Sequence, residues 1–459
     1  MKPSTEEDTT LTRLLKSDTQ KGVDPKVVLL RQKLAQKAKK ESKYRFYSLY
    51  SLIYRLDVLE TAWKLVKENG GSPGVDNVSI KDIEQQEGGY QALLLEINAE
   101  LQNRMYKPQP IRREYIPKTD GGQRPLGIPT VKDRVVQMAM VLILEPIFEA
   151  DFLECSYGFR PGISAHDGIQ EIVGEIKQGR TTIYDADMKG YFDSIPHDKL
   201  MACVRMRVTD SSVLHLIRKW LKTPIIETPK DKGGKPTITK PTRGTPQGGV
   251  ISPLLSNLYF HWFDKVFHRK GGPKERINAK LVRYADDFVV LTRYRSAETE
   301  EFIRDKLEGW MGLVINKEKT KLVDMKKKGS SIDFVGFNMR YVKSKINDGH
   351  YLKIEPKKKS FEKAKDRIRD LCARKNNYKP VKQVVQEVNR FLEGWSGYFK
   401  LGHPFDTFAK MDYFVEAQMH RHLRKRSQRG YKKDEEQTWY QFLQGQGLIR
   451  LSSKCEASR

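Results

Sequence analysis

Apolar residues recur at helical spacing along much of the chain, beginning with Phe46 to Asn69, where a Gly-rich segment at 70–74 then interrupts the pattern. The same period predicts helices at about 90–103, 131–149, 198–208, 212–221, 298–310, 360–374, 381–399 and 404–425. Short apolar runs predict strands at 111–117, 182–187, 280–292 and 334–341. Because strands and helices alternate between about 168 and 340 and the strands stop after Lys353, we predict an α+β fold with a mostly antiparallel sheet, followed by a helical region.

The chain carries a large positive surplus, since 84 Lys and Arg against 58 Asp and Glu give a formal net charge of +26. A surplus of this size points to a polyanion, most often nucleic acid, with a merely soluble basic protein as the alternative. The charge is uneven. Residues 1–45 are Lys-rich and are expected to form a basic N-terminal arm, and residues 357–382 hold eleven Lys and Arg against three Asp and Glu.

Several classes of protein are excluded by the same composition. The longest strongly apolar run, Met138 to Leu144, is far shorter than the ~18 residues of a membrane span, so we expect no membrane partner. The first thirty residues are charged and lack the apolar segment of a signal peptide. The four cysteines lie far apart without a CxxC pair, which argues against a disulfide framework and fits a reducing cytoplasm.

Acidic residues stand at two places where apolar strands end. Tyr284-Ala285-Asp286-Asp287 separates two apolar runs and is expected to form the turn of a buried hairpin, and Asp187 follows the apolar strand at 182–187. Ionised carboxylates are costly to bury unless they are paired or bind metal. An ordinary acidic turn remains the alternative for the tetrapeptide alone. Three carboxylates from two strands can hold two Mg²⁺ ions, whose preferred ligands are hard oxygens.

Nine short motifs, taken in their order along the chain, resemble those of a reverse transcriptase, specifically of the bacterial group II intron-encoded type. The resemblance runs from about Ser72 to Phe399. The motifs are GSPGVD at 71–76, PKxxxxxRPLGIP at 117–129, SYGFRP at 156–161, DxxxxFD at 187–193, TPQGGVISP at 245–253, YADD at 284–287, GLxxNxxKT at 312–320, FVGF at 334–337 and GWSGYF at 394–399.

The resemblance implies a right-hand polymerase fold with fingers, an antiparallel-sheet palm and a helical thumb. We expect the basic arm at 1–45, the fingers at 46–167, the palm at 168–352, the thumb or maturase domain X at 353–426, and a C-terminal tail at 427–459 that is a possible DNA-binding remnant. Many relatives continue into an HNH endonuclease with paired cysteines. Because the tail holds only Cys455, we expect no such domain in this sequence.

The resemblance implies a role for individual residues of these motifs. Asp187, Asp286 and Asp287 match the catalytic, metal-binding carboxylates, with Asp187 and Asp286 as the more direct ligands. Phe192 matches the aromatic residue that excludes a ribose 2′-OH, with core packing as the alternative. Lys118 and Arg124 are expected to bind the triphosphate, with a solvated basic hairpin as the alternative. Gln247 and Gly248 are expected beside the templating or incoming nucleotide, and Lys319 is a further expected nucleotide-binding residue.

The partners implied by the resemblance are group II intron RNA, an RNA template with a DNA primer, dNTPs and target DNA. Basic helices beyond Lys353 would track the sugar-phosphate backbone, extended by Arg421, Arg424, Lys425 and Arg426 as an RNA- or DNA-binding surface. The alternative is that these charged residues only form a solvated surface. For the aromatic residues of 394–399 we favour a place in the core over contact with nucleic acid.

The expected function is that of an RNA-directed DNA polymerase and maturase, which copies RNA into DNA with two Mg²⁺ ions and assists intron splicing and mobility. One alternative is a domesticated relative, in defence or a CRISPR locus, that polymerises DNA without splicing. The diversity-generating type is disfavoured because 247–253 reads QGxxxSP. A second alternative is a non-catalytic RNA-splicing chaperone, against which the three intact carboxylates count.

Overall fold

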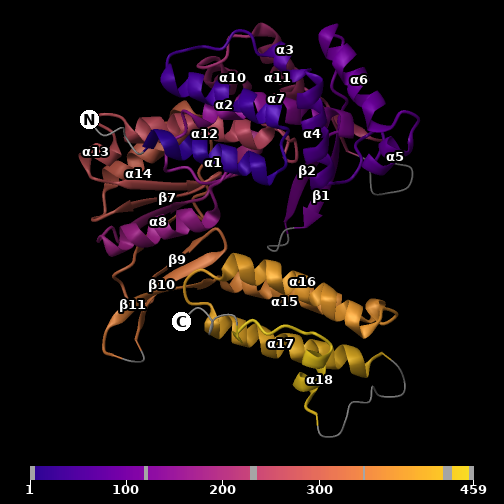
Figure 1. Cartoon of the computed structure of the whole chain (residues 1–459). Coiled ribbons are helices and arrows are strands. Elements are labelled where there is room, and N and C mark those ends of the chain that lie inside the picture. The colour runs from indigo at the N-terminus through magenta and orange to yellow at the C-terminus, as the bar shows by residue number, and fades with distance from the viewer. Residues whose placement is uncertain (1–5, 118–121, 228–234, 345–346, 427–436, 454–459) are drawn as a thin grey trace. The chain divides into compact units, whose positions relative to one another are not determined.

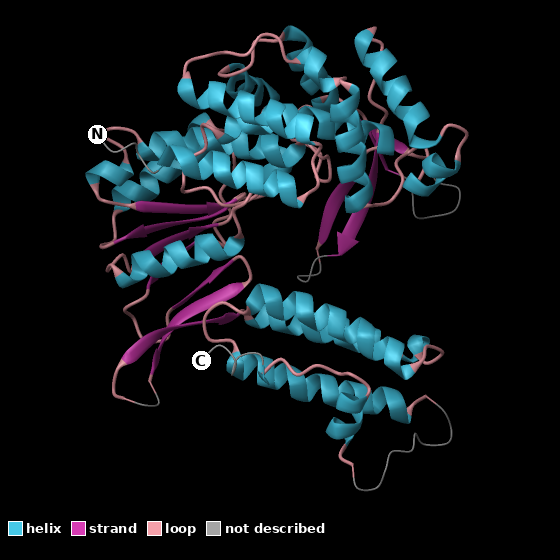
Figure 2. Ribbon diagram, viewed as in Figure 1, coloured by secondary structure: helices cyan, strands magenta, loops and turns pink. Residues whose placement is uncertain are grey.

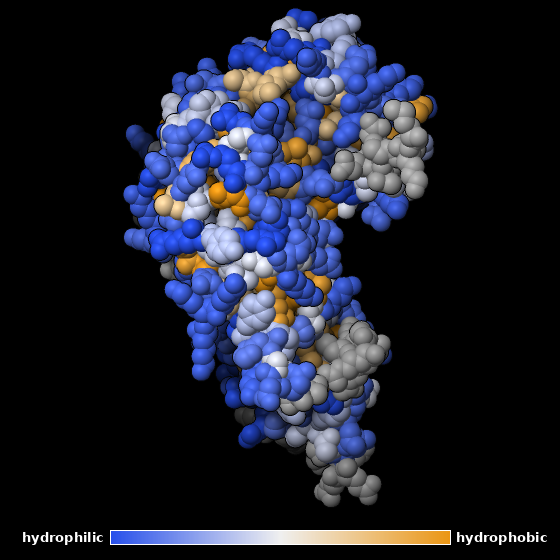
Figure 3. Space-filling view, turned by 90° about the vertical axis from the view of Figure 1, so that its left-hand side faces the viewer, coloured by the Kyte–Doolittle hydropathy of each residue, from blue (hydrophilic) through white to orange (hydrophobic). Residues whose placement is uncertain are grey.

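The computed structural model describes residues 6–117, 122–227, 235–344, 347–426 and 437–453, and the chain divides into two compact units. Unit 1 comprises Met1–Arg180 and Tyr184–Lys321, and unit 2 comprises Thr181–Ile183 and Leu322–Arg459. Figure 1 labels the elements, and Figure 2 separates the helices from the strands. Hydrophilic residues cover most of the face drawn in Figure 3, where apolar residues appear in separate patches.

The elements of unit 1 alternate between helices and strands after a helical start. Its helices are α1 (Glu6–Gln20), α2 (Pro25–Lys40), α3 (Tyr50–Ile53), α4 (Leu56–Asn69), α5 (Ile80–Gln85), α6 (Gly89–Gln102), α7 (Val131–Glu149), α8 (Ala165–Lys177), α9 (Tyr191–Ser194), α10 (His197–Arg205), α11 (Ser211–Leu221), α12 (Ser252–His268), α13 (Pro273–Arg276), α14 (Ala297–Arg304) and the π-helix η1 (Asp305–Trp310). Its strands are β1 (Ile111–Pro117), β2 (Gln123–Ile128), β4 (Ile225–Glu227), β5 (Thr237–Thr239), β6 (Lys280–Tyr284), β7 (Asp287–Thr292) and the last three residues of β3 (Thr182–Ala186).

Helix α7 lies at the centre of the helical part of unit 1 and packs against α2 and α4. Its N-cap is Thr130, whose side chain accepts from the backbone N–H of Asp133, and most of its residues are buried. The residues expected as a basic arm form α1 and α2. Arg31 of α2 is buried and donates to Asp18 at 2.8 Å, to Glu145 of α7 at 2.6 Å and to the carbonyl of Leu142. Buried ion pairs therefore tie this segment to α7.

Two sheets contain the strands predicted at 111–117, 182–187 and 280–292. In the first, β1 pairs antiparallel with β2 and parallel with β4, and β4 pairs with β5. In the second, β6 pairs antiparallel with β7, which neighbours β3. Alternate residues of the β6–β7 hairpin face opposite sides. Leu281, Phe288 and Val290 join the core beside α12, while α8 packs against the hairpin from the other side (Figure 1).

Unit 2 combines a small sheet with three long helices (Figure 2). Its elements are β8 (Lys321–Asp324), β9 (Ser331–Phe334), β10 (Phe337–Lys343), β11 (His350–Pro356), α15 (Lys358–Leu371), the 3-10 helix η2 (Arg374–Asn376), α16 (Val381–Phe399), α17 (Phe405–Arg424) and α18 (Trp439–Gly445). The core preference for 394–399 is confirmed for Trp395 and Phe399, which are buried against Phe408 and Phe337. Tyr398 is partly exposed, and its hydroxyl donates to the carbonyl of Val335.

Three predicted elements differ from the structure. The helix expected from Phe46 is split into α3 and α4, because the carbonyl of Tyr54 accepts from Asn98 and Arg55 bonds the side chain of Asp57 at 2.6 Å. The helix expected at 298–310 changes into a π-helix after Arg304. The strands continue to Pro356, past the predicted end at Lys353.

Two further features bear on chemistry. Within the described residues, Cys155, Cys203 and Cys372 are buried and free, and burial raises the pKa of Cys203 to about 11 and that of Cys372 to about 12. In the same part of the chain, no helix combines the length and the apolar character that crossing a bilayer would require.

Candidate active site

The YADD sequence forms the tight turn of the β6–β7 hairpin. Tyr284 pairs with Asp287, so Ala285 and Asp286 are the two residues of the turn. Ala285 is buried and has a φ of +58°, a conformation that glycine normally occupies at the first central position of such a turn. Asp286 is half-buried, and Asp287 is exposed where β7 begins. The sequence prediction of an acidic hairpin turn is confirmed.

Asp187 follows the end of β3, the strand next to β7. Asn316 fixes this residue through two hydrogen bonds: its side-chain amide donates to Asp187 Oδ2 at 3.0 Å, and its backbone N–H donates to the carbonyl of Asp187 at 2.8 Å. The backbone N–H of Asp187 also points to Thr320 Oγ1 at 3.4 Å. Asn316 and Thr320 belong to the GLxxNxxKT motif, in which only Lys319 had been assigned a role.

The surroundings of Asp286 change its pKa. Burial raises the pKa of Asp286 above its ordinary value, and the negative charge of Asp187 raises it further. The charges of Arg124 and Arg283 act in the opposite direction. Two carboxylates on neighbouring strands could bind a divalent cation, which would relieve their repulsion and which prefers hard oxygen ligands.

The expected cage of three carboxylates is not assembled in the structure. Among the described residues, no group of three His, Cys, Asp or Glu side chains is arranged so that it could hold a metal ion. Asp187 follows β3, and Asp286 lies in the turn that leads into the neighbouring strand β7, where the exposed Asp287 is the first residue. The participation of Asp287 therefore stays a prediction.

The TPQGG segment connects the expected nucleotide-binding residues. The N–H of Thr245 donates to the carbonyl of Phe192 at 2.7 Å, and the N–H of Gly127 donates to the carbonyl of Gln247 at 2.5 Å. Gly248 has a φ of +107°, and a Cβ placed there would lie 2.3 Å from the carbonyl oxygen of Gly127. Only glycine allows this approach, so the segment bridges α9 and β2.

The other expected nucleotide contacts differ in their surroundings. Phe192 is half-buried and makes an edge contact with Tyr191, with ring centroids 5.6 Å apart. Arg124 is exposed on β2, and its charge reaches Asp286. Lys319 is exposed. Lys118 lies outside the described residues.

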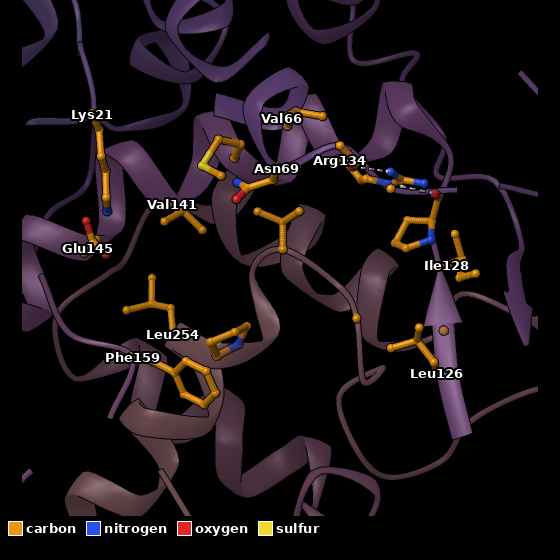
Figure 4. A pocket seen from close by; sticks show the side chains of 18 of the residues that line it. Lys21, Val66, Asn69, Leu126, Ile128, Arg134, Val141, Glu145, Phe159 and Leu254 are labelled. Carbon is orange, nitrogen blue, oxygen red and sulfur yellow. Dashed lines mark hydrogen bonds between the residues drawn. The ribbon is translucent and has the colours of Figure 1, made fainter. Parts of the chain in front are cut away.

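A cavity of about 870 Å³ in unit 1 includes Gly248 of the TPQGG segment in its lining. It is bounded by the end of α4, the 70–72 loop, β2, α7, the 159–163 segment and Gly248 to Leu254, and Tyr284 also lines it. Figure 4 shows Lys21, Arg134 and Phe159 among its side chains. Arg134 donates to the carbonyls of Gly70, Ser72 and Pro129, so it fixes the 70–72 loop. Sequence reasoning had assigned no role to Arg134, which lies in a helix without a motif.

The expected nucleic-acid surface of unit 2 lies at the end of α17. Arg421, Arg424 and Lys425 are exposed, whereas Arg426 is half-buried. His422, between them, is buried and bonds the carbonyl of Cys372 through Nδ1. The basic side chains are thus carried on a helix whose other face is packed.

Two family models match the chain. Residues 116–339 match "Reverse transcriptase (RNA-dependent DNA polymerase)", and residues 361–440 match "Group II intron, maturase-specific domain". The chain is 33% identical to Protein YkfC of Escherichia coli K12 over 368 residues, which cover 72% of this chain and 93% of that protein. It is 36% identical to the group II intron-encoded protein LtrA of Lactococcus lactis over 223 residues, which cover 48% of this chain and 35% of that protein.

Solved structures are more distant. A telomerase from Candida albicans in complex with a fragment of telomeric RNA matches with 13% identity and a TM-score of 0.40, over 92% of this chain and 91% of that chain. A partial Cas6-RT-Cas1–Cas2 complex matches with 21% identity and a TM-score of 0.33, over 56% and 41%. We base no conclusion on similarities this low. The family models and YkfC suffice: the chain is an RNA-directed DNA polymerase that belongs to the group II intron reverse transcriptase and maturase family.

Proposed function

We propose that this protein copies an RNA template into DNA at Asp187 and Asp286, with two Mg²⁺ ions, and that it assists the splicing and mobility of a group II intron. The observation that carries the catalytic part is the place of these carboxylates on neighbouring strands, since Asp187 follows β3 and Asp286 lies in the β6–β7 turn. Asp287 is proposed as an additional ligand.

The carboxylates would hold the ions, and Asn316 would orient Asp187 through its hydrogen bond to Oδ2. Two bound Mg²⁺ ions would supply activation of the primer 3′-hydroxyl and neutralisation of the leaving pyrophosphate. The side chains themselves position and neutralise, since nucleotidyl transfer needs alignment and charge stabilisation more than covalent help from the protein.

The incoming dNTP is proposed to bind between β2 and α9. Arg124, whose charge already reaches Asp286, would contact the triphosphate together with Lys118 and Lys319. Phe192 would lie under the sugar, and Gln247 and Gly248 would contact the base pair through the segment that bridges α9 and β2.

The template strand is proposed to pass through the cavity next to Tyr284. Its lining includes the charged residues Lys21, Arg134 and Glu145 and the partly exposed ring of Phe159, on which a base can stack. Its volume of about 870 Å³ suits nucleotides rather than one small ion.

The maturase part of the proposal concerns unit 2. The match to the maturase-specific domain over 361–440 supports intron RNA as the partner of α15 to α17, with Arg421, Arg424, Lys425 and Arg426 in contact with phosphates of the RNA or of target DNA. Splicing of the flanking intron RNA by the purified protein tests this part. It fails if the protein does not accelerate splicing at any Mg²⁺ concentration.

Substitution Asp286→Asn tests the catalytic part. We expect extension of a DNA primer on an RNA template to fall by at least about 100-fold, because the substitution removes a charge that would hold the ions. Binding of primer–template should remain. Asp348→Asn is the matched control, since its carboxylate is fully exposed and forms an ion pair with the exposed Lys343. Retained extension in Asp286→Asn would remove the catalytic assignment.

A further inference from the structure

A buried arginine lies directly beneath the catalytic turn. Arg283 belongs to β6, is fully buried, and faces α12 because it lies two residues after Leu281 on the same side of the strand. Its guanidinium binds Asp264 of α12 through two hydrogen bonds, Nε to Oδ1 at 3.0 Å and Nη2 to Oδ2 at 2.6 Å. This bidentate arrangement fixes the plane of the guanidinium group.

The remaining nitrogen of the guanidinium acts on the turn itself. Arg283 Nη1 donates to the carbonyl of Ala285 at 2.8 Å and to Asn257 Oδ1 at 2.9 Å. Ala285 is the turn residue with a φ of +58°, which is unfavourable for a side chain larger than hydrogen. The arginine thus holds the one peptide group of the turn whose conformation needs support from its surroundings.

Asn257 closes the arrangement from α12. Its side-chain amide donates to the carbonyl of Gly158 at 2.7 Å while its oxygen accepts from Arg283. Gly158 lies against the turn, since a Cβ added there would be 2.3 Å from the nitrogen of Ala285. The N–H of Arg283 donates to the carbonyl of Cys155, and its own carbonyl accepts from Tyr157. The 155–158 segment, α12 and β6 therefore enclose Ala285 together.

We propose that Arg283, Asn257 and Asp264 are positioning residues for catalysis: they hold Ala285 in its left-handed conformation and thereby fix the carboxylate of Asp286 beside Asp187. This inference rests on the proposed function. It goes further, because it assigns a catalytic consequence to three buried residues that would contact neither substrate nor metal. The competing explanation is that the cluster only stabilises the fold.

Metal affinity separates the two explanations. The probe is Mn²⁺, titrated by electron paramagnetic resonance into the full-length protein bound to a dideoxy-terminated primer on an RNA template with the matching dNTP. Asn257→Ala removes the contact to Gly158, and Arg283→Lys keeps the charge but loses the fork that reaches Ala285 and Asp264 together. We expect each variant to weaken Mn²⁺ binding about fivefold and to lower kcat about tenfold, with KM for dNTP nearly unchanged.

A matched control is Arg207→Lys, another buried arginine, which bonds the carbonyls of Ala38 and Ser42 and the carboxylate of Asp151, away from the turn. It should lower the melting temperature without changing Mn²⁺ affinity. If Arg207→Lys weakens Mn²⁺ binding as much as Asn257→Ala does, the effect comes from general destabilisation and the proposal is overturned.

Rescue provides the second measurement. Ala285→Gly makes the left-handed conformation accessible without support. In the double variant with Asn257→Ala, we expect Mn²⁺ affinity and kcat to recover at least half of their loss. An Asn257→Ala variant that folds and keeps both values, or a double variant with no recovery, contradicts the proposal. Failure of the proposed function is distinguishable, because Asp286→Asn would then retain Mn²⁺ binding and extension.

Discussion

Two antiparallel strand pairs of unit 1, β6–β7 and β1–β2, have opposite surroundings. In β6–β7, Leu281, Val282 and Val289 are fully buried, and a buried arginine supports the turn. In β1–β2, four of the seven residues of β1 are exposed, and the ion pair between Arg112 and Glu114 spans 3.8 Å. Asp286 and Asp287 therefore lie on a hairpin that its neighbours hold in place, whereas Arg124 lies on a hairpin that is largely exposed to solvent. Substitutions in the first should change fold and chemistry together, and those in the second should change only substrate binding.

The largest effect is expected from Gly158→Ala, which pushes a methyl group onto the catalytic turn. The added Cβ would lie 2.3 Å from the nitrogen of Ala285 and 2.9 Å from the carbonyl carbon of Tyr284, and both are backbone atoms. We expect about 3 kcal/mol of destabilisation and a loss of primer extension of about 100-fold or more. Urea denaturation and single-turnover extension measure the two effects.

Gly174→Ala is the control for this substitution, because Gly174 lies within α8 and a Cβ there meets no atom within 4 Å. This variant should be neutral or more stable by up to about 1 kcal/mol. Equal behaviour of the two glycine variants would refute the close packing of the 155–158 segment on the turn.

Acid should lower the free energy of unfolding through the buried His261 of α12. Burial lowers the pKa of His261 from 6.5 to about 4, and Asp264, 4.0 Å away, only partly opposes this. Lys265, Arg283 and Arg160 lower the pKa further. The unfolded chain takes up this proton below pH 6.5 and the native protein only near pH 4, so the free energy of unfolding should fall across that range, by roughly 3 kcal/mol at most.

The measurement is the free energy of unfolding at several pH values for the protein and for His261→Gln. The difference between the two should grow with acidity between pH 6.5 and about 4, because only the histidine can take up the proton. Parallel curves for the two proteins would rule out His261 as the origin of the acid sensitivity.

A smaller and separable effect is expected for Arg124→Gln in the exposed hairpin. Loss of one charged contact to the triphosphate should raise KM for dNTP about tenfold. The exposed position predicts a change in unfolding free energy within about 0.5 kcal/mol. Steady-state extension and thermal melting test the two parts. A drop in stability comparable to that of Gly158→Ala would erase the contrast between the hairpins.

The smallest effect is expected for Glu114→Gln, which removes the ion pair with Arg112. The carboxylate is 54% exposed and the atoms are 3.8 Å apart, so solvent screens the interaction. Stability should change by less than about 0.5 kcal/mol and should be insensitive to added salt. A larger, salt-dependent loss would show that charges also hold this hairpin in place.

The local sequence pattern was sufficient to predict elements that bury one continuous face. The helices at 131–149 and 381–399 begin and end where the apolar period predicts. Strands β4 and β5 were not predicted, because three residues carry no periodicity and β4 pairs with the distant strand β1. The break before α4 depends on Asn98, which no local pattern connects with Tyr54.

In the candidate site, too, the sequence predicted some residues and not others. Its acidic residues stand in short motifs, and the sequence therefore identified Asp187 and Asp286 together with the turn. The support of that turn comes from Arg283 on a strand, Asn257 and Asp264 on a helix, and Gly158 in a loop. Gly158 lies in the SYGFRP motif, but no local pattern connects it with Arg283, Asn257 or Asp264, and only the tertiary structure brings these residues into contact.

The three buried cysteines are expected to react slowly with thiol reagents. A thiol reacts as its thiolate, and burial suppresses that form in Cys155, Cys203 and Cys372. In a variant with Cys455 replaced by serine, a cysteine introduced at the exposed position of Tyr294 or Tyr115 should thus take up a maleimide dye far faster than the native thiols. Fluorescent labels can in this way report on the exposed hairpin while the catalytic turn remains chemically untouched.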